Sequence, residues 1–302
     1  MQSQIEDITF GVEIETTIPV SAGIRVGAYH AGFPVTGGVS GQQAFPAPRF
    51  NGAMWKVERD ISIAVQKAGH APAEFVSPVL KGEAGVRHLI EFLEFLRSIG
   101  ATVNRSTGLH IHIGVSGAAG TEEPVAYVER LTRLVGFNTK ALYAQTGTLS
   151  REKGRYCAPL GNGAKSAIAK AKKEKRLAQA AATGSRYEIL NLTNIATRGT
   201  VEFRCFAGSL NTSKVLLHLF SVLLLAIVAR KTKTPTSWDN RPLTGEKALT
   251  NLLKVRPVTR IVGAKTFAEH FPAMLAKALE MARKYDAAQA ALDLITLSSR
   301  NA

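Results

Sequence analysis

The sequence predicts an α+β fold, an antiparallel sheet with helices on one face. Strand-like segments alternate apolar and polar residues with a period of two, and they dominate the first half of the chain. Segments with helical spacing come between and after them, in an order that is neither the βαβα alternation of a doubly wound sheet nor an all-helical bundle. These three observations predict a mixed architecture, and the length of the chain fits one large globular domain or two small ones.

The predicted strands all lie within the first 208 residues. They comprise residues 10–19, 54–63, 72–80, 101–104, 108–115, 186–195 and 199–208, the last two paired through the turn at Arg198 and Gly199. Residues 21–53 are rich in glycine, proline and alanine, which predicts a loop that passes over the site or serves as a lid.

The predicted helices begin with residues 83–100, where Leu89, Phe92, Leu93 and Leu96 share one face and Gly100 ends the helix. Further helices are expected over residues 122–145, 164–182 and 212–231, the last capped by Asn211 or Thr212. Residues 232–242 read as a linker, followed by two or three helices. We therefore expect a catalytic domain over residues 1–231 and a helical extension packed on it over 232–302.

Composition narrows the class of protein. With 302 residues and 45% hydrophobic residues, the chain has ample core. Its two cysteines, Cys157 and Cys205, form no CxxC pair, which excludes a disulfide scaffold and a cysteine zinc site; an inert thiol is expected at Cys157. No secretory signal is visible, and the apolar run near residues 217–229 suits a buried helix better than a membrane span. We expect a cytoplasmic protein with no membrane contact.

The net charge of +15 is concentrated in residues 164–186, which hold seven basic residues against Glu174 alone. Such a field favours polyanions, including nucleic acid and nucleotide phosphates. A lysine-rich helix that only aids solubility is an equally good explanation.

Three predicted strands each carry a polar pair, two residues apart, opposite an apolar face: Glu13 and Glu15, His110 and His112, Glu202 and Arg204. Residues two apart on a strand point the same way, so one sheet would gather these groups on one side. Asp60 and Glu74 are further acids that could join them.

Carboxylates and imidazoles gathered in this way suit Mg²⁺ or Mn²⁺, and an arginine beside them could hold a phosphoryl group. A single pair is more often a solvated strand face. Three pairs on strongly apolar strands favour a metal site, and no Walker loop, GxGxxG, HExxH or GxSxG motif competes.

The ordered set FGVEIE, KVERDISI, AEFVSP, GLHIHIG, RYEILNL and TVEFRCFAG resembles the amidoligase family, over roughly residues 8–225. This family is a branch of the carboxylate–amine ligases with the glutamine synthetase fold. The resemblance implies a curved sheet that cups the active site, with helices on its outer face. It also implies ATP- and Mg²⁺-dependent formation of an amide (peptide or isopeptide) bond through an acyl phosphate, with release of ADP.

The same resemblance implies roles for individual residues. Metal ligands would be Glu13, Glu15, Glu74, His110 and Glu202, while Arg204 would contact the transferred phosphate; Glu13, Glu15, Glu202 and Arg204 form the catalytic set. Nucleotide or substrate contacts would come from Asp60, His112, Arg155, Tyr156, Arg186 and Asn191. For Tyr156 and Asn191 a structural role is equally good, and Trp55 is expected in the core.

Two alternatives remain open at this point. A basic nucleic-acid-binding protein would explain the charge, although the basic residues lack interleaved aromatics; a ligase acting on a nucleic-acid-linked, modified base would merge both features. A metal-dependent hydrolase would use the same ligands without ATP. For a ligase, the amine substrate would be an amino acid, peptide or polyamine, and the family often builds oligomers.

Overall fold

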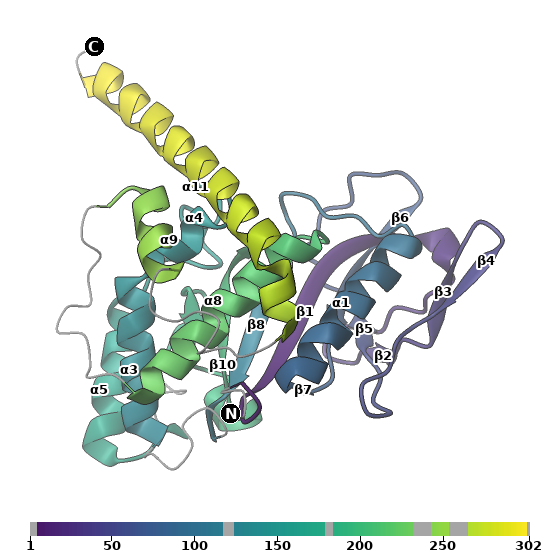
Figure 1. The fold of residues 1–302 in the computed structure, drawn as a ribbon, viewed down its shortest axis with the longest axis horizontal. Coiled ribbons are helices and arrows are strands. Elements are labelled where there is room, and N and C mark those ends of the chain that lie inside the picture. Colours follow the sequence, from purple (N-terminus) through teal and green to yellow (C-terminus); the bar gives the residue numbers. More distant parts are fainter. Residues whose placement is uncertain (1–4, 117–123, 179–183, 232–242, 254–264, 301–302) are drawn as a thin grey trace.

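The computed structural model describes residues 5–116, 124–178, 184–231, 243–253 and 265–300 (Figure 1). Within these residues, one eight-stranded sheet has the order β2-β5-β6-β1-β8-β10-β9, with β7 added to β1, and its strands pair antiparallel. The strands are β1 (Thr9–Pro19), β2 (Phe33–Pro34), β5 (Lys56–Glu58), β6 (His70–Val76), β7 (Leu80–Lys81), β8 (Gly108–Gly114), β9 (Leu190–Asn191) and β10 (Thr200–Ala207). A separate hairpin joins β3 (Gly37–Ser40) to β4 (Gln43–Pro46).

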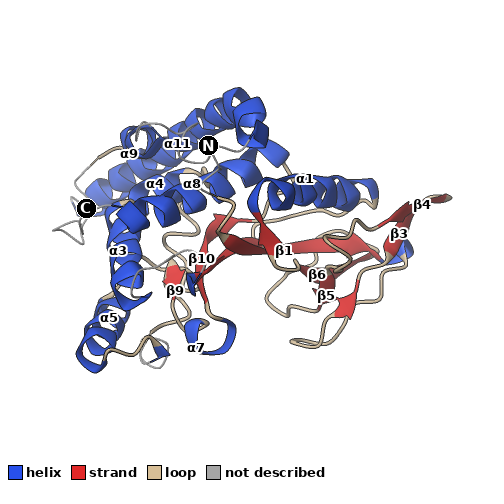
Figure 2. Cartoon of the chain, turned by 60° about the horizontal axis from the view of Figure 1, so that its bottom comes forward, coloured by secondary structure: helices blue, strands red, loops and turns tan. Residues whose placement is uncertain are grey.

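The larger helices lie in a layer over one face of the sheet, as Figure 2 shows for α1, α8, α9 and α11. The helices are η1 (Val20–Ala22, 3-10), α1 (Gly82–Ser98), α3 (Pro124–Phe137), α4 (Thr139–Ala144), α5 (Asn162–Glu174), α7 (Ile195–Arg198), α8 (Thr212–Lys231), α9 (Gly245–Leu253) and α11 (Lys265–Arg300). The predicted α+β class, with a mainly antiparallel sheet and C-terminal helices, is confirmed.

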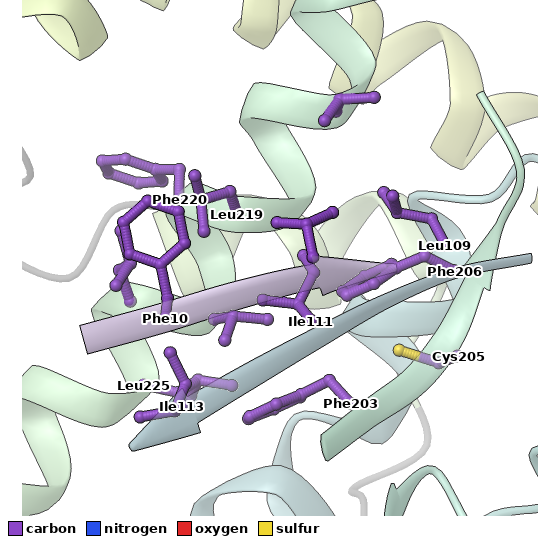
Figure 3. Packing of buried hydrophobic residues seen from close by; sticks show 14 of the residues in the cluster. Phe10, Leu109, Ile111, Ile113, Phe203, Cys205, Phe206, Leu219, Phe220 and Leu225 are labelled. Atoms are coloured by element: carbon purple, nitrogen blue, oxygen red, sulfur yellow. The ribbon is translucent and has the colours of Figure 1, made fainter. Parts of the chain in front are cut away.

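The core lies between the sheet and the helix layer. The apolar faces of β1, β8 and β10 meet α8, and Figure 3 shows Ile111, Phe203 and Phe206 on the strands and Leu219 and Leu225 on the helix as members of one cluster. All these side chains are buried, and burial of large apolar side chains is the main favourable term in folding. The alternation read from the sequence therefore leaves the opposite face of these strands to the polar pairs.

Helix α8 is the buried helix expected near residues 217–229. Its length and composition alone would allow it to cross a membrane, but 78% of the apolar window Thr212–Arg230 is buried inside the structure. Asn211 is the capping residue, since its side chain accepts the Lys214 N–H at 3.0 Å.

Several predicted elements are shorter than expected. The strand predicted over 54–63 ends at Glu58, because the Asp60 carboxylate accepts the Ser62 N–H at 2.6 Å and forms a turn. Residues 101–104 form only a bridge between Thr102 and Thr17, and the strand predicted over 186–195 is reduced to β9.

Of the predicted helices, one is divided into two and another ends early. The helix expected over 122–145 is split into α3 and α4 at Asn138, whose side-chain amide bonds the Leu134 carbonyl at 2.8 Å. The helix expected over 164–182 stops at Glu174, where Lys175 takes a left-handed conformation and Arg176 N–H bonds the Ala171 carbonyl at 3.1 Å. The predicted linker 232–242 lies outside the described residues.

The loop predicted over residues 21–53 contains β2 and the β3–β4 hairpin. Only its segment around Tyr29, His30 and Gly32 reaches the polar face of the sheet, where it lines the main cavity. Trp55 lies in the core as expected, fully buried and stacked on Phe92 with ring centroids 3.6 Å apart.

Candidate active site

The strand register brings the three polar pairs together. Glu13 on β1 lies opposite His110 on β8, and Glu202 on β10 lies opposite His112. Glu15 faces Glu74 on β6. Because opposite residues on antiparallel strands have neighbouring side chains, four adjacent strands build one polar floor.

His110 lies at the centre of this floor. Its Nδ1 is 3.2 Å from Glu13 Oε2 and 3.6 Å from Glu202 Oε1, while its Nε2 is 3.6 Å from Glu15 Oε1. The imidazole is almost fully buried. His110 therefore lies next to three of the carboxylates that the strand pattern indicated, Glu13, Glu15 and Glu202.

Burial opposes ionisation of Glu13, but hydrogen bonds and charge attraction from His110 and His112 outweigh it and hold the pKa of Glu13 well below its usual value. Burial also opposes protonation of His112, but the hydrogen bond and the negative charge of Glu13 outweigh this effect and raise the pKa of His112. Each group therefore favours the charged form of the other in the metal-free protein.

Glu15 is held by the backbone of β8. Its Oε2 accepts the Gly108 N–H at 2.6 Å. A side chain at Gly108 would put its Cβ 3.1 Å from His110 Nε2 and from Arg151 Nη2, so glycine lets the carboxylate and the guanidinium approach the strand. Arg151 donates to the Arg204 carbonyl at 2.7 Å, and its buried Nε has no hydrogen-bond partner.

Glu202 is fixed from both of its oxygens. Oε2 accepts the side-chain amides of Asn191 at 2.7 Å and Asn194 at 2.8 Å, while Oε1 forms an ion pair with Arg204. The Arg204 guanidinium also reaches the Tyr156 carbonyl, with Nε 3.4 Å away. A buried carboxylate oriented by two amides keeps one oxygen directed into the floor.

Glu74 has a different environment. Burial and the neighbouring carboxylates of Glu13, Glu15, Asp60 and Glu58 raise the pKa of Glu74 to about 9. Such crowding of acids is unfavourable unless a cation or protons neutralise it. This corner of the floor therefore takes up a proton at neutral pH when no cation is bound.

The donor set fits a hard divalent cation. Three overlapping groups bring their ligand atoms within 4.8 Å of one another: Glu13, His112 and Glu202; Glu13, Glu74 and His110; Glu15, Asp60 and Glu74. Carboxylate oxygens with an imidazole are ligands for Mg²⁺ and Mn²⁺. His112 Nε2 lies 3.1 Å from Glu13 Oε1, so the imidazole and the carboxylate are placed to contact the same cation.

A cavity of about 610 Å³ opens over the floor. Glu13, His110, Glu202 and Arg204 form its base, with Asp60 and Glu74 at one side, and all six were predicted site residues. Arg186 and Asn191 also line it. The volume suits a small-molecule substrate with several charged groups.

A second cavity, of about 470 Å³, begins where the first ends, and both share Glu13, Val76 and Arg198. Its lining is more apolar, with Phe10, Val12, Pro78, Val79 and Val115, and His112 lies in this cavity rather than in the first. The floor therefore has two approaches, one strongly charged and one largely apolar.

Arg155 and Tyr156 do not line either cavity. Both are exposed beside the first one, where Arg155 Nη2 donates to the Tyr156 hydroxyl at 2.8 Å. Cys157 is buried, burial raises the pKa of its thiol, and Sγ bonds the Arg151 carbonyl at 3.0 Å, as expected for an inert cysteine.

Sequence reasoning missed several residues of the site, among them Glu58, Arg151, Asn194 and Arg198. Glu58 had a detectable signal, because it precedes Asp60 by two residues and faces Glu74 in the register. Arg198 Nη1 lies 3.2 Å from Glu13 Oε1, yet the two are 185 residues apart in the chain. No spacing rule could have found that contact.

A family model with the description "Putative amidoligase enzyme" matches residues 6–224. The matched range begins just before β1 and ends within α8, so it contains every strand of the main sheet and every residue of the floor. No curated protein sequence matches the chain.

Proposed function

The chain belongs to the amidoligase family of ligase enzymes, and on that premise we propose that it joins a carboxylate to an amine with ATP, releasing ADP and phosphate. The observation that carries the proposal is the convergence of Glu13, Glu15, His110, Glu202 and Arg204 on one buried floor, open to a cavity of about 610 Å³. A curved sheet of the glutamine synthetase type is part of the same proposal.

The chemistry explains why such a floor is needed. A carboxylate is a poor electrophile, so one of its oxygens first attacks the γ-phosphorus of ATP, and the bond to ADP breaks. The amine nitrogen then attacks the acyl carbon of the acyl phosphate, phosphate leaves, and the amine gives up a proton. Both steps crowd negative oxygens together, and stabilising that charge is the main task of the protein.

Divalent cations would supply that neutralisation, held by Glu13, Glu15, Glu74, His110 and Glu202. Arg204 is directed to the transferred phosphoryl group, since a guanidinium matches phosphate oxygens in charge and shape. Asn191 and Asn194 orient Glu202, and Gly108 orients Glu15. These contacts support a preorganised site whose ligands need little rearrangement.

The second cavity suits the nucleoside of ATP. Its apolar lining, with Val12, Pro78 and Val79, fits a flat base, and it joins the first cavity at Glu13 and Arg198. A triphosphate entering from this side would reach the floor, which leaves the larger, charged cavity for the acid and the amine. The metal-dependent hydrolase alternative would give this apolar approach no role.

The test is the Glu202→Gln variant. We expect ADP release in the presence of an acid and an amine to fall by about 10²-fold or more, because one charged ligand is lost while the asparagine contacts can persist. Wild-type enzyme supplied with ¹⁸O-labelled carboxylate should release phosphate that carries one ¹⁸O atom, the signature of an acyl phosphate.

The matched control is Glu91→Gln, which changes an exposed glutamate on α1 in the helix layer. It should leave ADP release unchanged. Full activity of the Glu202→Gln protein would contradict the site, and phosphate without ¹⁸O would contradict the acyl phosphate. Amide cleavage without ATP would favour the hydrolase instead.

A further inference from the structure

Two arginine–tyrosine dipeptides, distant in the sequence, lie side by side at the mouth of the first cavity. Arg155–Tyr156 and Arg186–Tyr187 run parallel at this point, since Ala158 N–H bonds the Tyr187 carbonyl at 2.8 Å. The two tyrosine rings meet edge to face with centroids 5.9 Å apart. Each arginine also lies over the ring that follows it, at 4.8 Å and 5.6 Å.

Tyr29 extends this group from the opposite side of the cavity. Its hydroxyl accepts Arg186 Nη2 at 3.5 Å, and its ring contacts the His30 ring at 3.7 Å. Tyr29, His30 and Arg186 all line the cavity itself. We call these six residues the aromatic rim: Tyr29, His30, Arg155, Tyr156, Arg186 and Tyr187.

The rim is open to a ligand. Tyr29, Tyr156 and Tyr187 are 47%, 45% and 46% exposed, which is high for tyrosine rings that pack against one another. No carboxylate in the described residues forms an ion pair with Arg155 or Arg186. Flat rings and arginines with free charge are therefore presented together.

The rim is connected to the reactive floor. Arg204, the candidate phosphate-binding arginine, bonds the Tyr156 carbonyl, and Arg186 lines the same cavity as Glu202. Helix α5 begins four residues after Ala158 and carries exposed Lys172 and Lys173, and exposed Arg176 follows the end of the helix. Positive charge thus continues from the rim along the surface.

The sequence argued against a nucleic-acid surface because its basic residues lacked interleaved aromatics. At two positions, however, a tyrosine directly follows an arginine, at Tyr156 and Tyr187. The parallel contact at Ala158 and Glu188 brings these two dipeptides together. The sequence supplies each arginine–tyrosine pair, and the tertiary structure joins the pairs into one surface.

We propose that the aromatic rim binds a nucleotide unit of the substrate, a flat base beside a phosphate, distinct from the ATP that drives the reaction. Bases stack on tyrosine rings and on arginine planes, and the guanidinium groups bind phosphate. The unit belongs to a free nucleotide or to single-stranded nucleic acid. The inference rests on the proposed function only in treating the first cavity as the substrate site.

Binding is measured without turnover, by fluorescence anisotropy of a labelled oligothymidylate about 12 nucleotides long. The protein is full length, in about 50 mM salt, with Mg²⁺ and a saturating β,γ-imido analogue of ATP. We expect saturable binding to the wild type. The Tyr156→Ala, Tyr187→Ala double variant should raise Kd about tenfold or more, since stacking on each ring is lost.

Three matched variants distinguish how the tyrosine rings, the positive charge and the integrity of the fold contribute to the Kd. Tyr156→Phe with Tyr187→Phe retains the rings and should keep Kd within about twofold. Arg186→Ala should weaken binding and reduce its salt dependence, whereas Arg87→Ala, an exposed arginine of α1, should change neither. If thymidine monophosphate competes as effectively as the oligomer, per nucleotide, the substrate carries a free nucleotide. If it competes weakly, the nucleotide unit belongs to a single-stranded nucleic acid.

Equal binding by the wild type and the double alanine variant would overturn the proposal, as would absence of saturable binding. Oligomer binding that is saturable without the ATP analogue and is lost when the analogue is added would show that the rim serves ATP, and would also overturn the proposal. The Glu202→Gln protein should bind the oligomer normally. Failure of the rim and failure of the ligase assignment are thus seen in different experiments.

Discussion

At the scale of single residues, the floor holds carboxylates with opposite protonation behaviour. The pKa of Glu13 is held low by the two histidines, whereas burial and neighbouring acids raise the pKa of Glu74 to about 9. Both effects arise within one cluster on adjacent strands. Carboxylates with widely different pKa values are common at functional sites, because the surroundings of each group decide whether it ionises.

The Glu74 shift predicts how stability depends on pH in the metal-free protein. Between the unfolded pKa of about 4.5 and the folded pKa of about 9, the folded state holds a proton that the unfolded state has lost. Unfolding free energy therefore falls as pH rises through this window. In EDTA, Tm of the wild type should fall from pH 7 to pH 9, above the range in which the buried His88 and His218, whose pKa values burial lowers, act in the opposite direction. Glu74→Gln should flatten that fall.

His112 adds a decline of the same sign, because its raised pKa stabilises the folded state only while the imidazole is protonated. The comparison with Glu74→Gln isolates the glutamate. Glu91→Gln, the exposed control, should follow the wild type. A wild-type Tm that rises steadily to pH 9 in EDTA would contradict the environment described for Glu74.

At the scale of elements, the short segment from β9 through α7 to β10 closes one side of the floor. It supplies Asn191 and Asn194 to Glu202, and Arg198 to Glu13. Gly199 ends α7 in a left-handed conformation, with φ of 64°, so that β10 can start at once. Helix α7, only four residues long, thus places Arg198 beside Glu13, a candidate metal ligand.

We expect Arg198 to compete with a cation for Glu13. The Arg198→Ala variant should bind Mn²⁺ about two- to fivefold more tightly, the effect of removing a half-exposed ion pair. Its ATP-dependent turnover should nevertheless be slower, because the arginine also lines both cavities. Calorimetric titration with Mn²⁺ measures the first effect, and ADP release measures the second.

Arg87→Ala is the control for loss of one positive charge in the helix layer, and its Mn²⁺ affinity should stay at the wild-type value. Weaker Mn²⁺ binding by Arg198→Ala would mean that the arginine supports the cation site instead of competing with it. The ion pair with Glu13 would then be an incidental contact.

At the scale of the whole molecule, specific contacts tie the C-terminal helices to each other and to the region that the family model matches. Asp286 on α11 accepts the N–H groups of Gly245 at 2.5 Å and Glu246 at 3.0 Å, which caps the start of α9. Tyr285 on α11 donates to Glu152. These helices lie in the layer on the other side of the sheet from the floor (Figure 2).

The Asp286→Ala variant should therefore lower stability without changing catalysis. We expect the unfolding free energy to fall by about 0.5–2 kcal/mol, the usual effect of losing an N-terminal cap, and ADP release to stay at the wild-type rate. Asp286→Asn should recover most of the loss. Urea unfolding measures the first quantity, and a large loss of turnover would show that the C-terminal helices act on the site.

Much of the site could be predicted because a strand has a simple period. Glu13 with Glu15, His110 with His112, and Glu202 with Arg204 were readable as pairs, since residues two apart must share a face. The split of the helix at Asn138 and the early end at Lys175 were not readable, because side-chain and left-handed backbone contacts compete with helix propensity.

By itself, the sequence determined which face of each strand is apolar and which titratable groups stand opposite it. Only the tertiary structure decided the partners of those groups: the register that puts Glu13 against His110, the reach of Arg198 to Glu13, and the meeting of Tyr156 with Tyr187. Periodicity is a local property of the chain. Contacts between segments separated by 31 to 185 positions depend on strand pairing and packing, which no local pattern encodes.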